Sequence, residues 1–353
     1  MSAARRILIL YTELAGYTIA ALNALAAEQV DIHLVRWPVN AEAPFDFSFG
    51  DKLHVYDRKQ YDDKGLLKLA EEVKPDLILC SGWNDKGYLA VCKIWRNFVP
   101  VVLAMDNKWS GSARQQLARL VSRFTILRYF SHCWVPGPDQ QVYAEKLGFG
   151  KNRIKTGFYT CDTNRFSAVY RDTEAAKAQQ FPHVFVYAGR YYEFKGVHEM
   201  WSAFARLKQE SGNDWKLVCL GVGDITPPEH PDITHEGFVQ PEKLPEVMAR
   251  TGVFILPSRF EPWAVVVQEF AAAGFPVLLS DAVGASRFFL EEGRNGFRFR
   301  SNDEEALLAA MKHITELSDQ QLVQMGRRSH ELGTRVTPQS WAKTLLSFMS
   351  STN

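Results

Sequence analysis

Short apolar runs alternate with helical patterns along the first half of the chain. The strand-like runs are RILILYT, DIHLVRW, DLILC, VPVVLAM, CWVP and RIKTG. Helical patterns lie between them at about residues 16–28, 65–73, 86–97, 111–130 and 138–147. Repetition of strand and helix predicts a parallel sheet that is covered on both faces.

The same alternation restarts after a polar, turn-rich stretch, TGFYTCDTNRFSAVYRDTEAAKAQQFPH. The second series contains the strand-like runs HVFVYAGR, WKLVCLGVGD, HEGFV, VFILPS, PVLLSD and GFRFR. Its helices are predicted from about Gly196, at about 241–250, from about Ala264, and at about 303–317 and 318–332.

We therefore predict an α/β protein with two doubly wound, Rossmann-like parallel-sheet domains. The predicted domains are residues 1–165 and 166–353, and a last helix at about 338–350 is expected to pack back on the first domain. Two such domains leave a cleft at the carboxyl ends of their strands, where ligands bind.

Composition agrees with a globular chain of this size. The chain has 353 residues, of which 46% are hydrophobic and 23% charged, so two domains are expected. No apolar run approaches the roughly 20 residues that span a bilayer. The start has a basic pair and an apolar run, but Glu13 follows where a signal peptide would have its cleavage site, so we interpret it as a first strand.

Cysteine and histidine spacing predicts neither disulfides nor a metal. The five cysteines are scattered without a C-x-x-C pair, and the nine histidines form no metal-ligand motif. We expect buried thiols, a cytoplasmic location, no metal and no cofactor. The net charge of +1 does not point to nucleic acid as a partner.

Basic residues are concentrated in residues 111–130. No acid occurs between Asp106 and Asp139. The arginines there alternate with apolar side chains, which predicts a basic amphipathic helix suited to the inner face of the plasma membrane. The alternative is a surface helix whose apolar side packs on its own sheet.

Candidate anion-binding residues lie in AGRYYEFKGV. Gly189 ends a strand, and Arg190 and Lys195 precede a predicted helix start. Two cations beside a helix N-terminus can bind phosphate, although surface cations at a turn have the same pattern. A second strand ends in Gly221 and Gly223, which is too short for a dinucleotide fingerprint and is often a simple turn.

Two acids, Glu261 and Glu269, occur in the otherwise apolar stretch 258–281. Glu261 follows a strand, and Glu269 falls about one turn into a helix predicted over Ala264–Ala273. Carboxylates accept hydrogen bonds from vicinal diols, so both acids are candidates for sugar or ribose contacts. The alternative is a loop acid and a first-turn acid that favours the helix dipole.

Together these stretches resemble a known family. The matching segments are GR with KG at 189–196, G-x-G at 221–223, EGFV at 236–239, PSRFEPWAVVVQEFAAAGFPVLLSD and EEGRNGFRF at 291–299. In order and spacing they resemble the carboxyl-terminal half of retaining glycosyltransferases of group 1, also called family 4, which have the GT-B fold. The resemblance covers residues 183–317, and residues 1–165 match only in outline.

The resemblance implies roles for individual residues. Glu261 would contact the transferred sugar, Glu269 the ribose diol, and Arg190 with Lys195 the diphosphate. The remaining donor-binding residues that it implies are Gly189, Gly221, Gly223, Phe238, Val239, Trp263, Ala264, Val265 and Val266.

Some positions depart from the family pattern. The family commonly has glycine where Ala264 stands, and a methyl group there is tolerated unless the position needs positive φ. Asp106 takes the place nearest to a usual family histidine. On the acceptor side, Gly16 fits a small-residue turn, and Trp83 and Trp109 are candidates either for stacking on a sugar or for core packing.

The sequence therefore predicts a retaining, metal-independent hexosyltransferase. Its donor would be a UDP- or GDP-linked sugar, and its acceptor a glycan or lipid-linked glycan of surface polysaccharide or lipopolysaccharide biosynthesis. Three alternatives stay open: a non-catalytic sugar-nucleotide-binding subunit, a sugar-nucleotide epimerase or phosphorylase of the same fold, and a nicotinamide-dependent dehydrogenase. The last lacks a G-x-G-x-x-G fingerprint.

Overall fold

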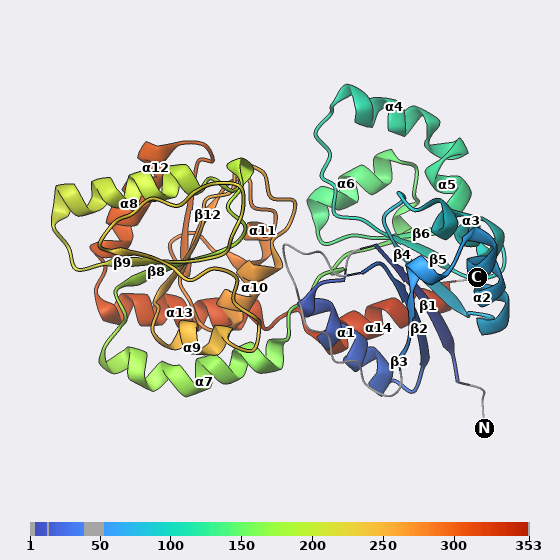
Figure 1. Cartoon of the computed structure of the whole chain (residues 1–353), viewed down its shortest axis with the longest axis horizontal. Coiled ribbons are helices and arrows are strands. Elements are labelled where there is room, and N and C mark those ends of the chain that lie inside the picture. Colours follow the sequence, from blue (N-terminus) through green and yellow to red (C-terminus); the bar gives the residue numbers. More distant parts are fainter. Residues whose placement is uncertain (1–3, 13, 39–52, 352–353) are drawn as a thin grey trace. The chain divides into compact units, whose positions relative to one another are not determined.

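The chain forms two compact units (Figure 1). The computed structural model describes residues 4–12, 14–38 and 53–351; Glu13 lies outside this part. Unit 1 comprises residues 1–160 and 337–353, and unit 2 comprises residues 161–336. The division falls five residues before the predicted boundary, which would have cut a helix that begins at Thr163.

Unit 1 contains a seven-stranded parallel sheet in the order β3-β2-β1-β4-β5-β6-β7. Its strands are β1 Arg6–Tyr11, β2 Asp31–Arg36, β3 Leu53–Asp57, β4 Leu77–Ser81, β5 Val101–Ala104, β6 His132–Trp134 and β7 Ile154–Lys155. Its helices are α1 Gly16–Ala27, α2 Asp63–Val73, α3 Lys86–Trp95, α4 Ala113–Val121, α5 Ile126–Tyr129, α6 Pro138–Lys146 and α14 Pro338–Leu346.

Alternation along β1 shows why this sheet is buried on both faces. Leu8 and Leu10 enter one apolar cluster with residues of α2, α3 and α6. Ile7 and Ile9 enter a second cluster with residues of α1 and α14. A parallel strand with helices on both sides reads as a continuous apolar run. The last helix thus packs in unit 1.

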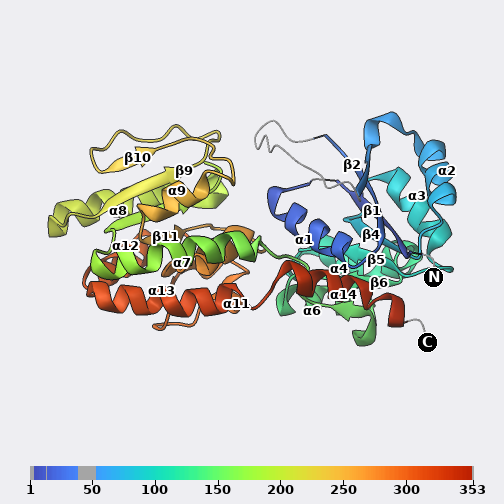
Figure 2. The ribbon, with the colours of Figure 1, turned by 90° about the horizontal axis from the view of Figure 1, so that it is seen from below.

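Unit 2 contains a six-stranded parallel sheet in the order β10-β9-β8-β11-β12-β13. Its strands are β8 Val184–Ala188, β9 Lys216–Leu220, β10 Ile233–His235, β11 Val253–Leu256, β12 Val277–Ser280 and β13 Gly296–Phe299. Its helices are α7 Thr163–Gln179, α8 Val197–Ser211, α9 Leu244–Ala249, α10 Val265–Ala272, α11 Ser286–Phe289, α12 Glu304–Thr315 and α13 Asp319–Gly333. Figures 1 and 2 show α8 with α12 on one face, and α7, α10 and α13 on the other.

Several predicted elements were wrong. The stretch assigned to a domain break does contain the division between the units, but most of it is α7, which Asp162 caps by accepting a hydrogen bond from the Arg165 N–H. Strand β10 is Ile233–His235, so it shares only His235 with the predicted strand HEGFV. The basic stretch is not one helix, because Thr125 has non-helical backbone angles, φ −116° and ψ −89°, and divides it into α4, a 3-10 turn and α5. Strand β3 was not predicted.

The five cysteines are free and buried, as expected. Among the described residues, no helix is long and apolar enough to cross a membrane.

Candidate active site

The predicted donor residues of unit 2 lie at the carboxyl edge of its sheet. Strand β8 lies inside the sheet. The next two strands along the chain, β9 and β10, lie on one side of it, and the later strands β11 and β12 lie on the other side. Between β8 and β11, the loops that follow the two strands diverge to opposite sides of the sheet. Parallel α/β sheets bind ligands at such a switch point.

The loop after β8 approaches the loop after β11 closely. It contains a 3-10 turn, Glu193–Lys195, and then Gly196, which has φ +68° and precedes α8. A Cβ on Gly196 would lie 2.3 Å from the carbonyl oxygen of Pro257. Positive φ and backbone contact both require glycine here, and they bring Lys195 against the second loop.

Lys195 forms an ion pair with Glu261. Its Nζ lies 2.5 Å from Oε2 of Glu261, and the two side chains are only 14% and 12% exposed. The Ser258 hydroxyl lies 3.5 Å from the same carboxylate oxygen. The structure therefore joins two residues that the sequence predicted for one site but assigned to different parts of the donor.

Arg190 lies close to the same place. Its carbonyl oxygen accepts a 2.9 Å hydrogen bond from the buried Tyr187 hydroxyl, and its guanidinium lies over the Tyr192 ring at 5.2 Å. Burial raises the pKa of Tyr187 well above its usual value, with the Glu261 charge adding to this effect and the Arg190 charge opposing it. Both charges thus act at Tyr187, which the sequence did not single out.

Arg259 holds the two loops together, and it was also missed. Its N–H donates to the Phe194 carbonyl at 2.8 Å, and its Nε lies 2.7 Å from a Glu199 carboxylate oxygen on α8. Its Nη1 lies 2.5 Å from Glu193. The sequence signal that could have indicated Arg259 is its place in PSRFEP, directly after a strand, where it is a third cation besides Arg190 and Lys195.

Helix α10 begins after a strained residue. Ala264 is its N-cap, with φ +78° and ψ 86°, so the position that departs from the family glycine does adopt positive φ. The helix itself starts at Val265, one residue later than predicted, and Val266 follows. Its N-terminus faces the carboxyl edge of the sheet, because β11 leads into it.

Glu269 lies in the second turn of α10, as its spacing predicted. Burial raises the pKa of its carboxyl to about 7; the Arg165 charge opposes this shift and Asp162 adds to it. Some of the side chain is still exposed. An acid held in this way can accept hydrogen bonds from a diol once it ionises.

The other predicted donor residues also lie at this edge. Gly221 follows β9, and a Cβ there would lie 1.9 Å from the Gly189 carbonyl oxygen, while a Cβ on Gly223 would lie 2.3 Å from that of Tyr191. These glycines therefore let the ends of β8 and β9 pack together. Phe238 and Val239 follow β10, and buried Trp263 precedes Ala264.

The predicted residues of unit 1 occupy the carboxyl edge of its own sheet. Gly16 is the first residue of α1. Asp106, after β5, accepts a 3.1 Å hydrogen bond from the Tyr159 hydroxyl. Trp83 and Trp109 are half-buried against the core, and Trp109 also contacts the Tyr143 ring and the Lys146 ammonium. These contacts support packing roles for both indoles.

One family model matches a segment of unit 2. Residues 182–316 match the family model for group 1 glycosyl transferases, and this segment contains every donor-site residue described above in unit 2 except Arg165 and Asp162. Residues 182–316 are therefore similar to group 1 glycosyl transferases, as the sequence motifs predicted.

Two curated relatives carry more specific names. The lipopolysaccharide core biosynthesis glycosyltransferase LpsE of Rhizobium meliloti (strain 1021) is 30% identical over 236 residues, which cover 61% of this chain and 64% of that protein. The alpha-D-kanosaminyltransferase of Streptomyces kanamyceticus is 28% identical over 145 residues, which cover 35% and 36%. The chain thus spans less than two thirds of each.

Solved structures confirm the fold. HepE of Anabaena, in complex with UDP and glucose, has a TM-score of 0.70 at 16% identity, with 98% of this chain and 100% of that chain covered. Sucrose-phosphate synthase of Thermosynechococcus elongatus has a TM-score of 0.73 at 16% identity, with 98% of both chains covered. The fold is the GT-B fold of glycosyltransferases.

Proposed function

We propose that this protein is a glycosyltransferase that moves a sugar from a nucleoside diphosphate sugar to a hydroxyl of a glycan acceptor. The observation that carries the proposal is the Lys195–Glu261 pair at the switch point of the unit 2 sheet, within the segment that matches the family. The Lys195 cation suits the diphosphate of such a donor, and the Glu261 carboxylate suits its sugar.

The diphosphate would bind where positive potential is concentrated. Arg190 and Lys195 precede the N-terminus of α8, and Val265 and Val266 begin α10. Unpaired N–H groups at helix starts and adjacent cations favour phosphate. The name of the HepE complex supports UDP as the nucleotide, and GDP is the alternative.

Donor binding would exchange partners within the ion pair. Without donor, Lys195 neutralises Glu261. A diphosphate offers Lys195 a more strongly charged partner, which would release the Glu261 carboxylate to accept hydrogen bonds from sugar hydroxyls. The half-buried Glu269 would accept the ribose diol.

We further propose a retaining, metal-independent reaction. As the sugar carbon becomes positive, the departing diphosphate gains negative charge, which Lys195, Arg190 and the helix N-termini stabilise. Same-face attack by the acceptor, assisted by the leaving phosphate, would retain configuration. Asp106, which accepts a hydrogen bond from the Tyr159 hydroxyl, takes the place nearest to the family histidine and is proposed as a catalytic residue on that resemblance.

The acceptor is proposed to be a glycan of surface polysaccharide or lipopolysaccharide biosynthesis. The name of the Rhizobium relative supports this class. A lipid-linked acceptor would place the protein at a membrane surface, and unit 1 carries a surface suited to that place.

Helix α4 and the turn after it expose apolar side chains beside arginines. None of the α4 side chains is buried, and Leu120 and Phe124 are 76% and 74% exposed. The alternative from the sequence, an apolar side that packs on its own sheet, does not hold for these two residues. Neighbouring Arg119 and Arg123 favour an anionic bilayer surface. We propose peripheral contact with the inner face of the plasma membrane.

A panel of nucleotide sugars tests the donor proposal. At 100 times its dissociation constant, a ligand stabilises by about 2.7 kcal/mol, or about 5–10 °C in melting temperature for a domain of this size. We expect this shift with a UDP- or GDP-sugar, a reduced shift in Lys195→Met, and a full shift in Lys243→Met, whose exposed lysine pairs with Glu246. A response to NADH alone would instead support a dehydrogenase.

Turnover separates the remaining alternatives. Release of nucleoside diphosphate that depends on a glycan acceptor supports transfer. Binding without any turnover would indicate a non-catalytic subunit, and turnover without a glycan acceptor would indicate an epimerase or phosphorylase.

Sedimentation with lipid vesicles tests membrane contact. Phosphatidylglycerol vesicles should bind the protein, and Leu120→Ser with Phe124→Ser should weaken binding at least about tenfold, because two apolar side chains no longer enter the interface. Val142→Ser removes one exposed apolar side chain from α6 and should have little effect. Equal binding of all three proteins would contradict the proposal.

A further inference from the structure

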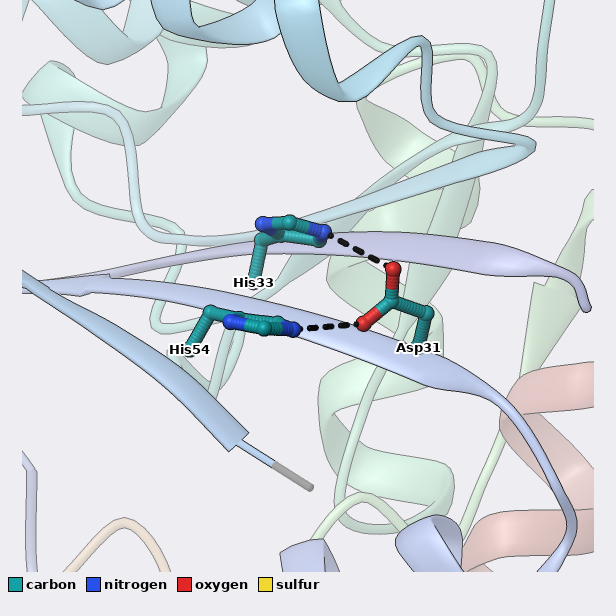
Figure 3. Close-up of side chains that lie close together, drawn as sticks. All are labelled: Asp31, His33 and His54. Carbon is teal, nitrogen blue, oxygen red and sulfur yellow. Dashed lines mark hydrogen bonds and ion pairs between the residues drawn. The ribbon is translucent and has the colours of Figure 1, made fainter. Parts of the chain in front are cut away.

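A cluster of two histidines and one aspartate lies on the edge of the unit 1 sheet. Strands β2 and β3 are parallel neighbours there, and their register places His33 opposite His54. Asp31 lies two residues before His33 on β2, and side chains two apart on a strand point to the same face. The three side chains therefore share one face (Figure 3).

Both imidazole rings direct Nε2 at the Asp31 carboxylate. The distances are 3.3 Å from His33 to Oδ2 and 3.0 Å from His54 to Oδ1. The rings stack with centroids 4.7 Å apart. The ligand atoms of the three residues all lie within 4.8 Å of one another.

This cluster lies away from the candidate active site. Asp31 is the first residue of β2, at the amino end of the strand, whereas Gly16 and Asp106 follow the carboxyl ends of β1 and β5. Within unit 1 the cluster is therefore separate from Gly16 and Asp106, and its role does not depend on the proposed function.

A neighbouring hydroxyl holds the His33 ring in an orientation that suits a metal ligand. Its Nδ1 lies 2.9 Å from the Tyr56 hydroxyl. A histidine that binds metal through Nε2 carries its proton on Nδ1 and donates it to a second group, which fixes the ring. Burial lowers the pKa of His33, and Asp31 opposes this shift.

We propose that Asp31, His33 and His54 bind a divalent transition-metal ion of the zinc class. Imidazole nitrogen and carboxylate oxygen are zinc ligands at about 2.0–2.2 Å, and tetrahedral ligands at that distance are about 3.4 Å apart. The two donor separations of 3.3 and 3.0 Å are close to this value. Water would complete the coordination.

Binding requires one adjustment. Stacked rings direct their lone pairs nearly parallel, so one ring must tilt for both to reach a single ion. The His54 side chain is 53% exposed, against 12% for His33, so His54 has room to turn. The ion would then join edge strand β3 to β2 through side chains as well as through the backbone.

Nearby charges set a moderate affinity. Arg6 on β1 lies opposite Asp31 on β2 in the strand register, and its charge acts on His33, which opposes a cation. Glu72 on α2 acts on Tyr56, which favours one. Three ligands in a half-exposed site and these opposing charges predict weaker zinc binding than in closed structural sites with four protein ligands.

Zinc titration of tag-free, chelator-treated protein tests the proposal. We expect one zinc ion per chain, and Co²⁺ in its place should produce visible absorption bands of a nitrogen- and oxygen-ligated ion. His54→Ala should weaken zinc binding at least about 100-fold. Mutation of a residue that only hydrogen-bonds to a metal ligand lowers metal affinity by about 10–100-fold, and loss of a ligand itself should cost more. Asp31→Asn should also weaken binding while keeping the shape of the side chain.

His198→Ala is the matched control. His198 is similarly exposed, at 56%, and lies 3.9 Å from the carboxylate of Glu193. Zinc binding of this variant should equal that of the wild type. Absence of zinc binding in the wild type, or equal binding in His54→Ala and wild type, would show that the cluster is only a hydrogen-bonded contact between two strands.

Discussion

The Lys195–Glu261 ion pair predicts a strong energetic coupling within unit 2. Lys195→Met leaves the Glu261 carboxylate without its cation, and Glu261→Gln leaves the ammonium without its acid. Removal of one partner from a fully buried pair costs about 3–5 kcal/mol. Because these side chains keep 14% and 12% exposure, we expect a smaller loss of about 2–3 kcal/mol for each variant.

The double variant should be no less stable than either single variant. Both charges are then absent, so no desolvated charge is left unpaired. The coupling energy obtained from the four proteins should reach about 2 kcal/mol, within the range for residues in contact. In a domain of this size each single substitution should lower the melting temperature by about 4–12 °C.

Thermal unfolding of the four proteins measures this coupling. The Lys243–Glu246 pair in the same unit is the control, because its side chains are 67% and 71% exposed. Corresponding substitutions there should change stability by less than about 0.5 kcal/mol. If the Lys195 and Glu261 effects simply add in the double variant, the two charges do not stabilise each other and the reasoning is refuted.

Three other substitutions should have the following results. Lys177 is buried, its Nζ has no hydrogen-bond partner among the described residues, and it lies 3.7 Å from the Phe275 ring; burial lowers its pKa to about 7. The free energy of unfolding should therefore rise with pH from about 7 towards 10.5. In urea unfolding, Lys177→Met should be more stable than the wild type by about 2 kcal/mol at pH 7, and this difference should shrink by pH 10. Equal stability of the two proteins at pH 7 would contradict the prediction. Ala264→Gly should stabilise by about 0.5–1 kcal/mol, because relief of positive φ, about 1–2 kcal/mol, exceeds the entropy loss of glycine, and a lower melting temperature would disprove it. Lys195→Ala should slow transfer about 100-fold while a chelator leaves the wild-type rate unchanged; activity that needs added magnesium, with Lys195→Ala near wild type, would overturn the leaving-group mechanism.

Much of unit 2 could be predicted because its strands are buried on both faces. VFVYA and VFIL in β8 and β11 are continuous apolar runs, and the residues directly after them mark the carboxyl edge of the sheet. The motif spacing then placed Lys195 and Glu261 in loops that the structure joins.

Edge and polar elements were harder to predict. Strand β3, LHVYD, is an edge strand with half-exposed side chains, so it lacks a long apolar run. Helix α7 has only four buried side chains among 17 residues. Its composition is mostly polar, so few apolar residues mark the helical period in the sequence.

Long-range register explains why the histidine cluster was missed. Asp31 and His33 form D-x-H on one strand, and His54 belongs to a strand whose pairing the sequence did not reveal. Spacing rules for metal ligands detect residues within one segment and do not detect neighbours joined by a sheet.

We propose that the unit 2 site holds a nucleoside diphosphate sugar, with Glu269 at the ribose and Glu261 at the sugar. Calorimetric titration of the nucleoside diphosphate and of its sugar conjugate into wild type, Glu261→Gln and Glu269→Gln tests it directly. Glu269→Gln should weaken both ligands by about tenfold or more, since a hydrogen bond to a charged group contributes about 1.5–3 kcal/mol. Glu261→Gln should weaken only the sugar conjugate. Equal losses of both ligands in both variants would contradict the assignment.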